Sequence, residues 1–210
     1  MGAYLEYMER QRDDAPLYVF DKGFFHNNPE LARHVGTPPH LDEDVLAALG
    51  DARRPDHRWL IVGPARSGSH FHIDPNVTSA FNAVIRGRKR WLLLPPGAPP
   101  PGVYPTPDQL DVATPFTVVE WFLSFYEAAS QAGGLLEATV GPGDVMFVPG
   151  GWWHLVLNLE PGIALTANYL PPSRLPRALQ HYECRRHLVS GLPHERRARL
   201  YEDLVEALER

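Results

Sequence analysis

Two histidines and an aspartate alternate with apolar residues in the first half of the chain, at His70, His72 and Asp74. If this segment is a strand, side chains two positions apart share a face, so an imidazole nitrogen and a carboxylate oxygen can meet at one point. A third donor, His154, lies in an apolar stretch where an unpaired histidine would be costly to bury. Two histidines and one carboxylate leave coordination positions open, as in non-heme Fe(II) oxygenases. The residues therefore predict a metal site, but strand spacing cannot decide between His70 and His72.

The competing interpretation of these residues is structural, because a buried histidine is more often a hydrogen-bonded core residue than a metal ligand. Other chemistries find less support. Ser67 and Ser69 lack the GxSxG elbow of hydrolases, and no glycine-rich phosphate loop ending in GK[ST] is present. The single cysteine, Cys184, excludes an intrachain disulfide, a cysteine zinc cluster and a CxxC redox pair.

The composition is that of a globular protein. The chain has 210 residues, of which 44% are hydrophobic and 21% charged, enough for one domain with a full core. A net charge of -5 argues against nucleic-acid binding over the whole surface. The N-terminus lacks the basic and apolar regions of a secretory signal, and no apolar stretch suits a membrane span. We therefore expect a soluble protein of the cytoplasm or nucleus.

Apolar periodicity predicts a mainly β protein with helices at both ends. Short apolar runs bounded by turn residues predict strands at 16–21, 59–62, 79–85, 90–94, 139–140, 145–148, 152–157 and 163–169. Pro142-Gly143 suits a tight turn between two of these strands. Helical spacing predicts helices at 4–12, 41–50, 116–132, 174–189 and 194–209. We expect one structural domain in three parts, an N-terminal extension (1–57), a β core (58–172) and C-terminal helices (173–210).

Three longer stretches carry a resemblance to a known family: Trp59–Pro75, Thr78–Trp91 and Val148–Asn158. Together they resemble the Jumonji C (JmjC) family of Fe(II)/2-oxoglutarate-dependent oxygenases. The resemblance is greatest to the branch of the lysyl hydroxylase and arginine demethylase once called the phosphatidylserine receptor. It spans residues 15–172 and includes the upstream segment Pro16–Asp21. The fold class that it implies is a double-stranded β-helix, the cupin-like jelly roll.

The resemblance also implies a metal and a reaction. Iron would be held by His72, Asp74 and His154, with His70 a neighbour rather than a ligand. The implied cofactors are Fe(II), 2-oxoglutarate as co-substrate and O2. The keto acid would be converted to succinate and CO2 while a C–H bond of a protein or peptide substrate is hydroxylated. A lysyl side chain is the favoured target, and hydroxylation of an N-methyl carbon would instead give demethylation with release of formaldehyde.

Co-substrate binding is implied for a second group of residues. In the family a lysine pairs with the distal carboxylate of 2-oxoglutarate, and the matching residue is Lys89, one of two lysines in the chain. Strand spacing agrees, because it puts Lys89 and Trp91 on one face and Arg90 on the other. The hydroxyl of Thr166 would join Lys89 at that carboxylate. Further residues match positions that line the co-substrate pocket: Asn82, Tyr18 and Ser69.

Two other functions remain open from the sequence. One is a catalytically silent cupin-like binding module, and the other is a zinc-dependent hydrolase on the same fold. The partner expected for the oxygenase is a protein or peptide, with no membrane and no nucleic acid. The C-terminal stripe of Leu200, Leu204 and Leu208 could pack on the β core or form a dimer interface, and we expect a homodimer through these helices.

Overall fold

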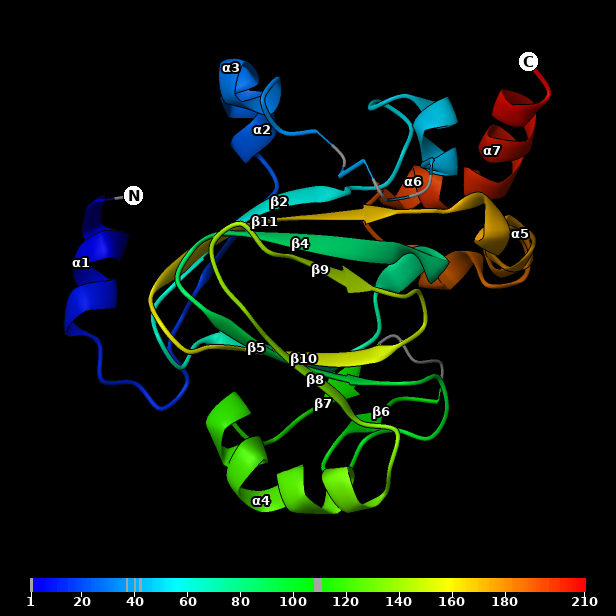
Figure 1. The fold of residues 1–210 in the computed structure, drawn as a ribbon. Coiled ribbons are helices and arrows are strands. Elements are labelled where there is room, and N and C mark those ends of the chain that lie inside the picture. Colours follow the sequence, from blue (N-terminus) through cyan, green and yellow to red (C-terminus); the bar gives the residue numbers. More distant parts are fainter. Residues whose placement is uncertain (1, 37, 40, 42, 108–110) are drawn as a thin grey trace.

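Two antiparallel β-sheets pack face to face, with helices on their outside (Figure 1). The computed structural model describes residues 2–36, 38–39, 41, 43–107 and 111–210. The first sheet has the order β1 (Val19–Asp21), β2 (Arg58–Gly63), β11 (Gly162–Tyr169), β4 (Ser79–Arg86) and β9 (Val145–Val148). The second has the order β3 (Gly68–His72), β10 (Trp153–Asn158), β5 (Lys89–Leu94) and β8 (Leu136–Val140). A separate hairpin consists of β6 (Tyr104–Pro105) and β7 (Val112–Ala113).

Successive strands alternate between the two sheets, so the chain crosses from one sheet to the other several times. The chain runs from β2 in the first sheet to β3 in the second, then to β4 and β5, and later alternates again from β8 through β11. This winding brings strands that are distant in sequence side by side, as with β3 and β10, and it is the winding of a jelly roll. The predicted fold class, mainly β with flanking helices, is confirmed.

The core between the sheets is apolar, and strand alternation decides which side chains enter it. Its buried members are Ala80, Val84, Trp91, Leu93, Val140, Val148 and Val156. Lys89 shares the inward face of β5 with Trp91, and each is only 4% exposed. Arg90, between them, points outward and pairs with Glu137 at 2.7 Å. The face predicted for Lys89 from strand spacing is therefore confirmed.

Helix α4 (Val118–Gln131) covers the outer face of the second sheet (Figure 1). It begins with a capping box, in which Thr117 accepts a hydrogen bond from the Glu120 amide and the Glu120 carboxylate accepts one from the Thr117 amide. Its Trp121 ring meets Phe71 of β3 edge to face, with the ring centroids 4.8 Å apart. The predicted helix at 116–132 is confirmed, and it fixes β3 from outside.

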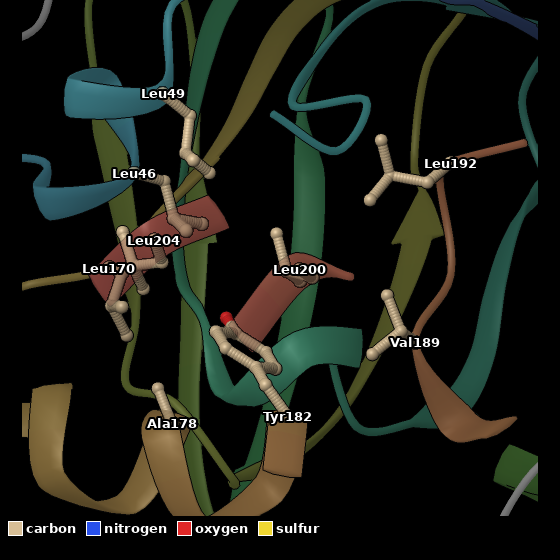
Figure 2. Packing of buried hydrophobic residues seen from close by; sticks show 9 residues of the cluster. All are labelled: Leu46, Leu49, Leu170, Ala178, Tyr182, Val189, Leu192, Leu200 and Leu204. Carbon is tan, nitrogen blue, oxygen red and sulfur yellow. The ribbon is translucent and has the colours of Figure 1, made fainter. Parts of the chain in front are cut away.

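A second apolar cluster joins the C-terminal helices to the 3-10 helix η1 (Val45–Leu49) (Figure 2). The helices concerned are α5 (Leu175–Cys184) and α7 (Leu200–Leu208), whereas the short α6 (His194–Arg197) has no buried residue. Leu200 and Leu204 are fully buried in this cluster, whereas Leu208 is 44% exposed. Most of the predicted leucine stripe is thus covered within one chain. The homodimer through these helices stays a prediction.

Shorter helices complete the chain and include three departures from prediction. Their bounds are α1 (Gly2–Arg10), α2 (Phe24–Asn27), α3 (Pro29–Ala32), η2 (Pro75–Val77), η3 (Pro172–Arg174) and η4 (Arg186–Leu188). The predicted helix at 41–50 is only the short η1, and residue 42 lies outside the described residues. The predicted helix at 174–189 is helical as α5 only to Cys184. The predicted helix at 194–209 is divided into α6 and α7. At the last break the Ala198 carbonyl is satisfied from outside the helices, because it accepts a hydrogen bond from Arg186 Nη1 at 2.5 Å. No helix in the described part is long and apolar enough to cross a bilayer.

Candidate metal centre

The predicted donors His72, Asp74 and His154 lie together between the sheets. His72 ends β3 and is paired directly across the ladder with His154 of β10. Asp74 follows β3, and its Oδ1 lies 3.9 Å from His72 Nε2 and 3.8 Å from His154 Nε2. All three donor atoms lie within 4.8 Å of one another. Within the described residues this is the one group of three such side chains that could hold a metal ion.

Both imidazoles are oriented from behind by backbone carbonyls. His72 Nδ1 lies 2.7 Å from the carbonyl oxygen of His70, and His154 Nδ1 lies 3.2 Å from that of Trp152. A hydrogen on Nδ1 satisfies these carbonyls and leaves the Nε2 lone pairs directed at Asp74, which is the usual support of a metal-binding histidine.

The protonation state of His154 also suits a ligand. Burial, together with the neighbouring His72, lowers the pKa of His154 to about 4, so its ring is neutral near pH 7. Metal ligation requires a neutral imidazole. Oδ2 of Asp74 is buried without a hydrogen-bond partner among the described residues, so this carboxylate has a free acceptor beside the two rings. The residues present therefore fit a divalent metal ion.

His70 resolves the ambiguity that strand spacing left. Its ring is not part of the group of three donors, and it contributes instead the carbonyl that orients His72. Burial, with a smaller effect of His72, lowers the pKa of the His70 ring as well. The ladder between β3 and β10 contains a β-bulge beside His154, so the alternation of side chains is interrupted there.

A small cavity between the sheets adjoins the metal donors, and Lys89 lies in its wall. The Lys89 ammonium donates a hydrogen bond to Asn158 Oδ1 at 2.7 Å, and Asn158 Nδ2 donates in turn to Ser67 Oγ at 2.8 Å. No carboxylate of the described residues pairs with Lys89. Burial lowers the pKa of Lys89 to about 8, so it is mostly charged near pH 7. A buried cation without an anionic partner is costly, which makes this wall suitable for an anion.

The other predicted pocket residues line the same cavity. The Tyr18 hydroxyl and Ser69 Oγ share a hydrogen bond of 2.6 Å, and Thr166 Oγ1 donates to the Phe81 carbonyl at 2.9 Å. Asn82 Oδ1 is buried without a partner among the described residues. The cavity thus brings together all five side chains expected at the co-substrate. The Thr166 proton is already used, so its hydroxyl would have to rotate before it could donate to a carboxylate.

The loop after Asp74 is held by the C-terminal helices, which sequence reasoning did not anticipate. Asn76 and Val77 both have positive φ, 57° and 63°, a conformation that a β-branched residue rarely adopts. The Asn76 side chain donates to the Ser190 carbonyl and accepts from the Ser190 amide. The buried Tyr182 hydroxyl donates to the Asn76 carbonyl at 2.7 Å. The bracing groups are more than a hundred residues away in sequence, so no local signal could identify them.

A larger groove of about 830 Å³ opens on the other side of His72 and Asp74. α5 and the residues that flank it form part of its wall, and the polar residues there include Arg174, Arg177, His181 and Arg185. These residues were not predicted to belong to the site. Their spacing of three and four residues was visible in the sequence, but a basic helical face is more often simply solvated.

The family follows from a comparison with known protein families, in which the family described as "Cupin-like domain" matches residues 1–174. The chain belongs to the cupin-like domain family. The match covers both sheets and all three metal donors. It ends where α5 begins, so the groove wall on that helix lies almost entirely beyond it.

Named relatives of this cupin-like chain carry JmjC titles. The chain is 45% identical over 209 residues to "Arginine-specific demethylase JMJ22" of Arabidopsis thaliana, covering 98% of this chain and 41% of that protein. It is 45% identical over 171 residues to "Lysine-specific demethylase JMJ21" of the same plant, covering 80% and 18%. It is 37% identical over 176 residues to "Bifunctional arginine demethylase and lysyl-hydroxylase psr-1" of Caenorhabditis elegans, covering 80% and 44%.

These relatives confirm the resemblance to the JmjC branch of arginine demethylases and lysyl hydroxylases. The cupin-like chain spans less than half the length of each of them.

Proposed function

We propose that this chain is an Fe(II)- and 2-oxoglutarate-dependent dioxygenase that hydroxylates a protein side chain, with lysine favoured, or demethylates an N-methylated residue. One observation carries the proposal. The buried Lys89 ammonium has no anionic partner among the described residues and lies in the wall of the same small cavity as the metal donors. A dicarboxylate that binds metal at one end and lysine at the other satisfies both. The names of the relatives support the reaction class.

Each side chain has a distinct task in this proposal. His72, Asp74 and His154 hold the ion through Nε2 of each histidine and the carboxylate of the aspartate. Lys89 binds the distal carboxylate of 2-oxoglutarate, and Asn158 holds the ammonium in position.

Four other side chains complete the pocket, and they accept or donate hydrogen bonds around the keto acid: Thr166, Asn82, Tyr18 and Ser69. The unpartnered Asn82 amide oxygen and Trp91 indole nitrogen give the pocket a further acceptor and a donor, which suits a polar occupant.

The chemistry itself belongs to the bound ion and its co-substrates. With O2, Fe(II) and 2-oxoglutarate supply an oxidation in which one oxygen atom enters a C–H bond of the substrate and the other enters succinate, with loss of CO2. The protein contributes ligand geometry, a pocket that excludes water and the orientation of both substrates. If the hydroxylated carbon is an N-methyl group, the product collapses to formaldehyde and the demethylated amine.

Location and assembly are also part of the proposal. We place the protein in the cytoplasm or nucleus, because it has one cysteine and its reaction would act on intracellular proteins. A homodimer would have to use the exposed side of α7, including Leu208, since Leu200 and Leu204 are covered within the chain. A sedimentation mass equal to that of one chain would contradict the dimer.

The test is to incubate the chain with Fe(II), 2-oxoglutarate, O2 and a library of lysine-containing and N-methylated peptides. We expect succinate formation that depends on both Fe(II) and the keto acid, with a peptide mass gain of one oxygen or release of formaldehyde. A folded chain that binds metal but forms no succinate would be a silent binding module. Turnover of an ester or amide with Zn(II), without 2-oxoglutarate, would identify a hydrolase instead.

A further inference from the structure

One face of α5 presents a row of cationic and ionisable side chains to the groove beside the metal donors. Arg177 and His181 lie four residues apart on α5, Arg174 immediately precedes the helix and Arg185 immediately follows it, and all four line the groove. An adjacent side of the helix packs into the apolar cluster of Figure 2, where Ala178 and Tyr182 are fully buried. The helix is therefore held in a fixed orientation, with its basic face turned to the groove.

The arginines of this face differ in how they are used. Arg174 donates from Nε to the Val77 carbonyl at 3.0 Å and packs against Gly150, where a Cβ would lie 2.5 Å from that nitrogen. Arg174 thus supports the loop after Asp74. Arg177 and Arg185 are exposed and form no ion pair with any described residue.

Other arginines of this chain form ion pairs with carboxylates. Arg186, one residue beyond Arg185, pairs with Glu202 at 2.7 Å, and Arg88 pairs with Glu160 at the same distance. Apart from Asp74, the one carboxylate that lines the groove among the described residues is Asp111. The positive charge of the α5 face is therefore not balanced inside the groove.

Besides its burial, the pKa of His181 reflects the positive charge of the neighbouring arginines. Burial lowers its pKa, and Arg185 and Arg177 lower it further by repulsion. Its Nε2 is buried without a hydrogen-bond partner among the described residues. A local excess of positive charge in a chain of net charge -5 is a matched surface for a negatively charged partner.

We infer that the groove binds a protein segment carrying Asp or Glu residues beside the modified side chain, with Arg177 and Arg185 contacting those carboxylates. This inference rests on the proposed function, since it names the substrate class of the same site. Planar guanidinium groups bind carboxylates through two parallel hydrogen bonds, which orients the segment as well as attracting it. The overall negative charge disfavours a nucleic acid as occupant.

Binding can be measured without turnover. The metal-loaded full chain, with 2-oxoglutarate present and O2 excluded, is titrated into three fluorescent peptides. Each has a central lysine flanked by Glu, by Gln or by Arg. We expect the Glu peptide to bind about tenfold more tightly than the Gln peptide at low salt, and the difference to shrink as ionic strength rises. Equal affinity of the Glu and Gln peptides would overturn the inference.

Charge reversal then tests the two arginines. The variant Arg177→Glu/Arg185→Glu should lose the preference for the Glu peptide and gain one for the Arg peptide. A merely structural effect would not produce that exchange. The matched control is Arg12→Glu, since Arg12 is an exposed arginine that does not line the groove and has no ion pair with a described residue. It should leave all three affinities unchanged.

Two further outcomes decide between the explanations. A single-stranded RNA that displaces the Glu peptide and binds more tightly than it would overturn the protein substrate. Succinate formation with the peptide library described above measures the proposed function separately. If that reaction is absent while the preference and its exchange are present, the proposed oxygenase fails and the acidic binding site stands. If succinate forms but the preference is absent, the acidic binding site fails and the proposed oxygenase stands.

Discussion

The inner cavity and the outer groove share His72 and Asp74, yet different parts of the chain build them. The cavity lies between the two sheets and takes its walls from strands, with Lys89 and Asn158 hydrogen-bonded in its wall. The groove takes a wall from α5 and the residue after it, where Arg177 and Arg185 are exposed and unpaired among the described residues. The cavity is therefore small and enclosed by strand residues, whereas the groove is larger and lined by basic side chains.

Under the proposed function, this difference means that the reaction and its target would be determined by different parts of the chain. The family match covers the strands and stops at residue 174, so it carries the metal donors and Lys89. The α5 face begins at that point. If both proposals hold, a relative that keeps the strands and changes α5 would keep the chemistry and accept a different substrate.

The largest effect is expected where the two regions meet. Asp74→Ala removes the carboxylate that lies between the two imidazoles, so metal binding and succinate formation should fall below detection. Asp111→Ala is the matched control, because Asp111 also lines the groove but lies outside the donor group. Metal content per chain after dialysis is the measurement. Unchanged metal content in the Asp74 variant would break the assignment of the metal site.

The next effect isolates the inner cavity. Lys89→Met should raise the KM for 2-oxoglutarate about a hundredfold, because it removes one partner of a buried charge pair. Peptide affinity at the groove should not change. Lys22→Met is the control, since Lys22 is exposed and pairs with Asp56 far from the cavity. The comparison fails if both lysine variants have the same KM.

Because burial lowers the pKa of Lys89, we also expect the stability of the protein to depend on pH. Its pKa of about 8 in the folded chain lies below its ordinary value of 10.5, so the folded state disfavours the charged form. The penalty is full below pH 8 and is relieved as pH rises from 8 to 10.5, which adds about 3 kcal/mol to the free energy of unfolding. Denaturant titrations of the metal-free chain should show this gain, and Lys89→Met should lack it. A parallel pH profile in the variant would contradict the buried, unpaired ammonium.

The smallest effect concerns the brace between the two regions. Tyr182→Phe leaves the Asn76 carbonyl without its donor, so we expect a loss of about 1 kcal/mol in the free energy of unfolding. Metal affinity should fall about tenfold, because the loop after Asp74 is less well held. Tyr126→Phe is the control, since Tyr126 bonds Glu137 at the surface. If both variants keep the same metal affinity, α5 does not support the donor loop.

Much of the cavity could be predicted because strand alternation is regular. Lys89 and Trp91 face inward and Arg90 outward, as two-residue spacing requires. Ser69 and His72 are three apart, so alternation would separate them, yet both line the cavity because the β-bulge interrupts the pattern. The prediction that Ser69 and His72 belong to one site rested on the family resemblance and not on strand spacing.

Long-range packing decided the rest, and the sequence carries little sign of it. Gly143 has φ 91°, as the predicted turn needs, but β8 and β9 on either side belong to different sheets. The support of the donor loop by Tyr182 and Ser190 spans more than a hundred residues. The groove could not be placed because the orientation of α5 depends on which of its faces is buried.

The direct pairing of His72 with His154 limits where the chain can change length. Adding or deleting one residue within β3 or β10 would turn one imidazole to the outer face, where Phe71 and Leu155 now pack. The proline-rich segment between β5 and α4 contributes none of the three donors, so a change in its length would leave the pairing of the two histidines unaltered. Length variation among working relatives should therefore gather in that segment and be absent from the two strands.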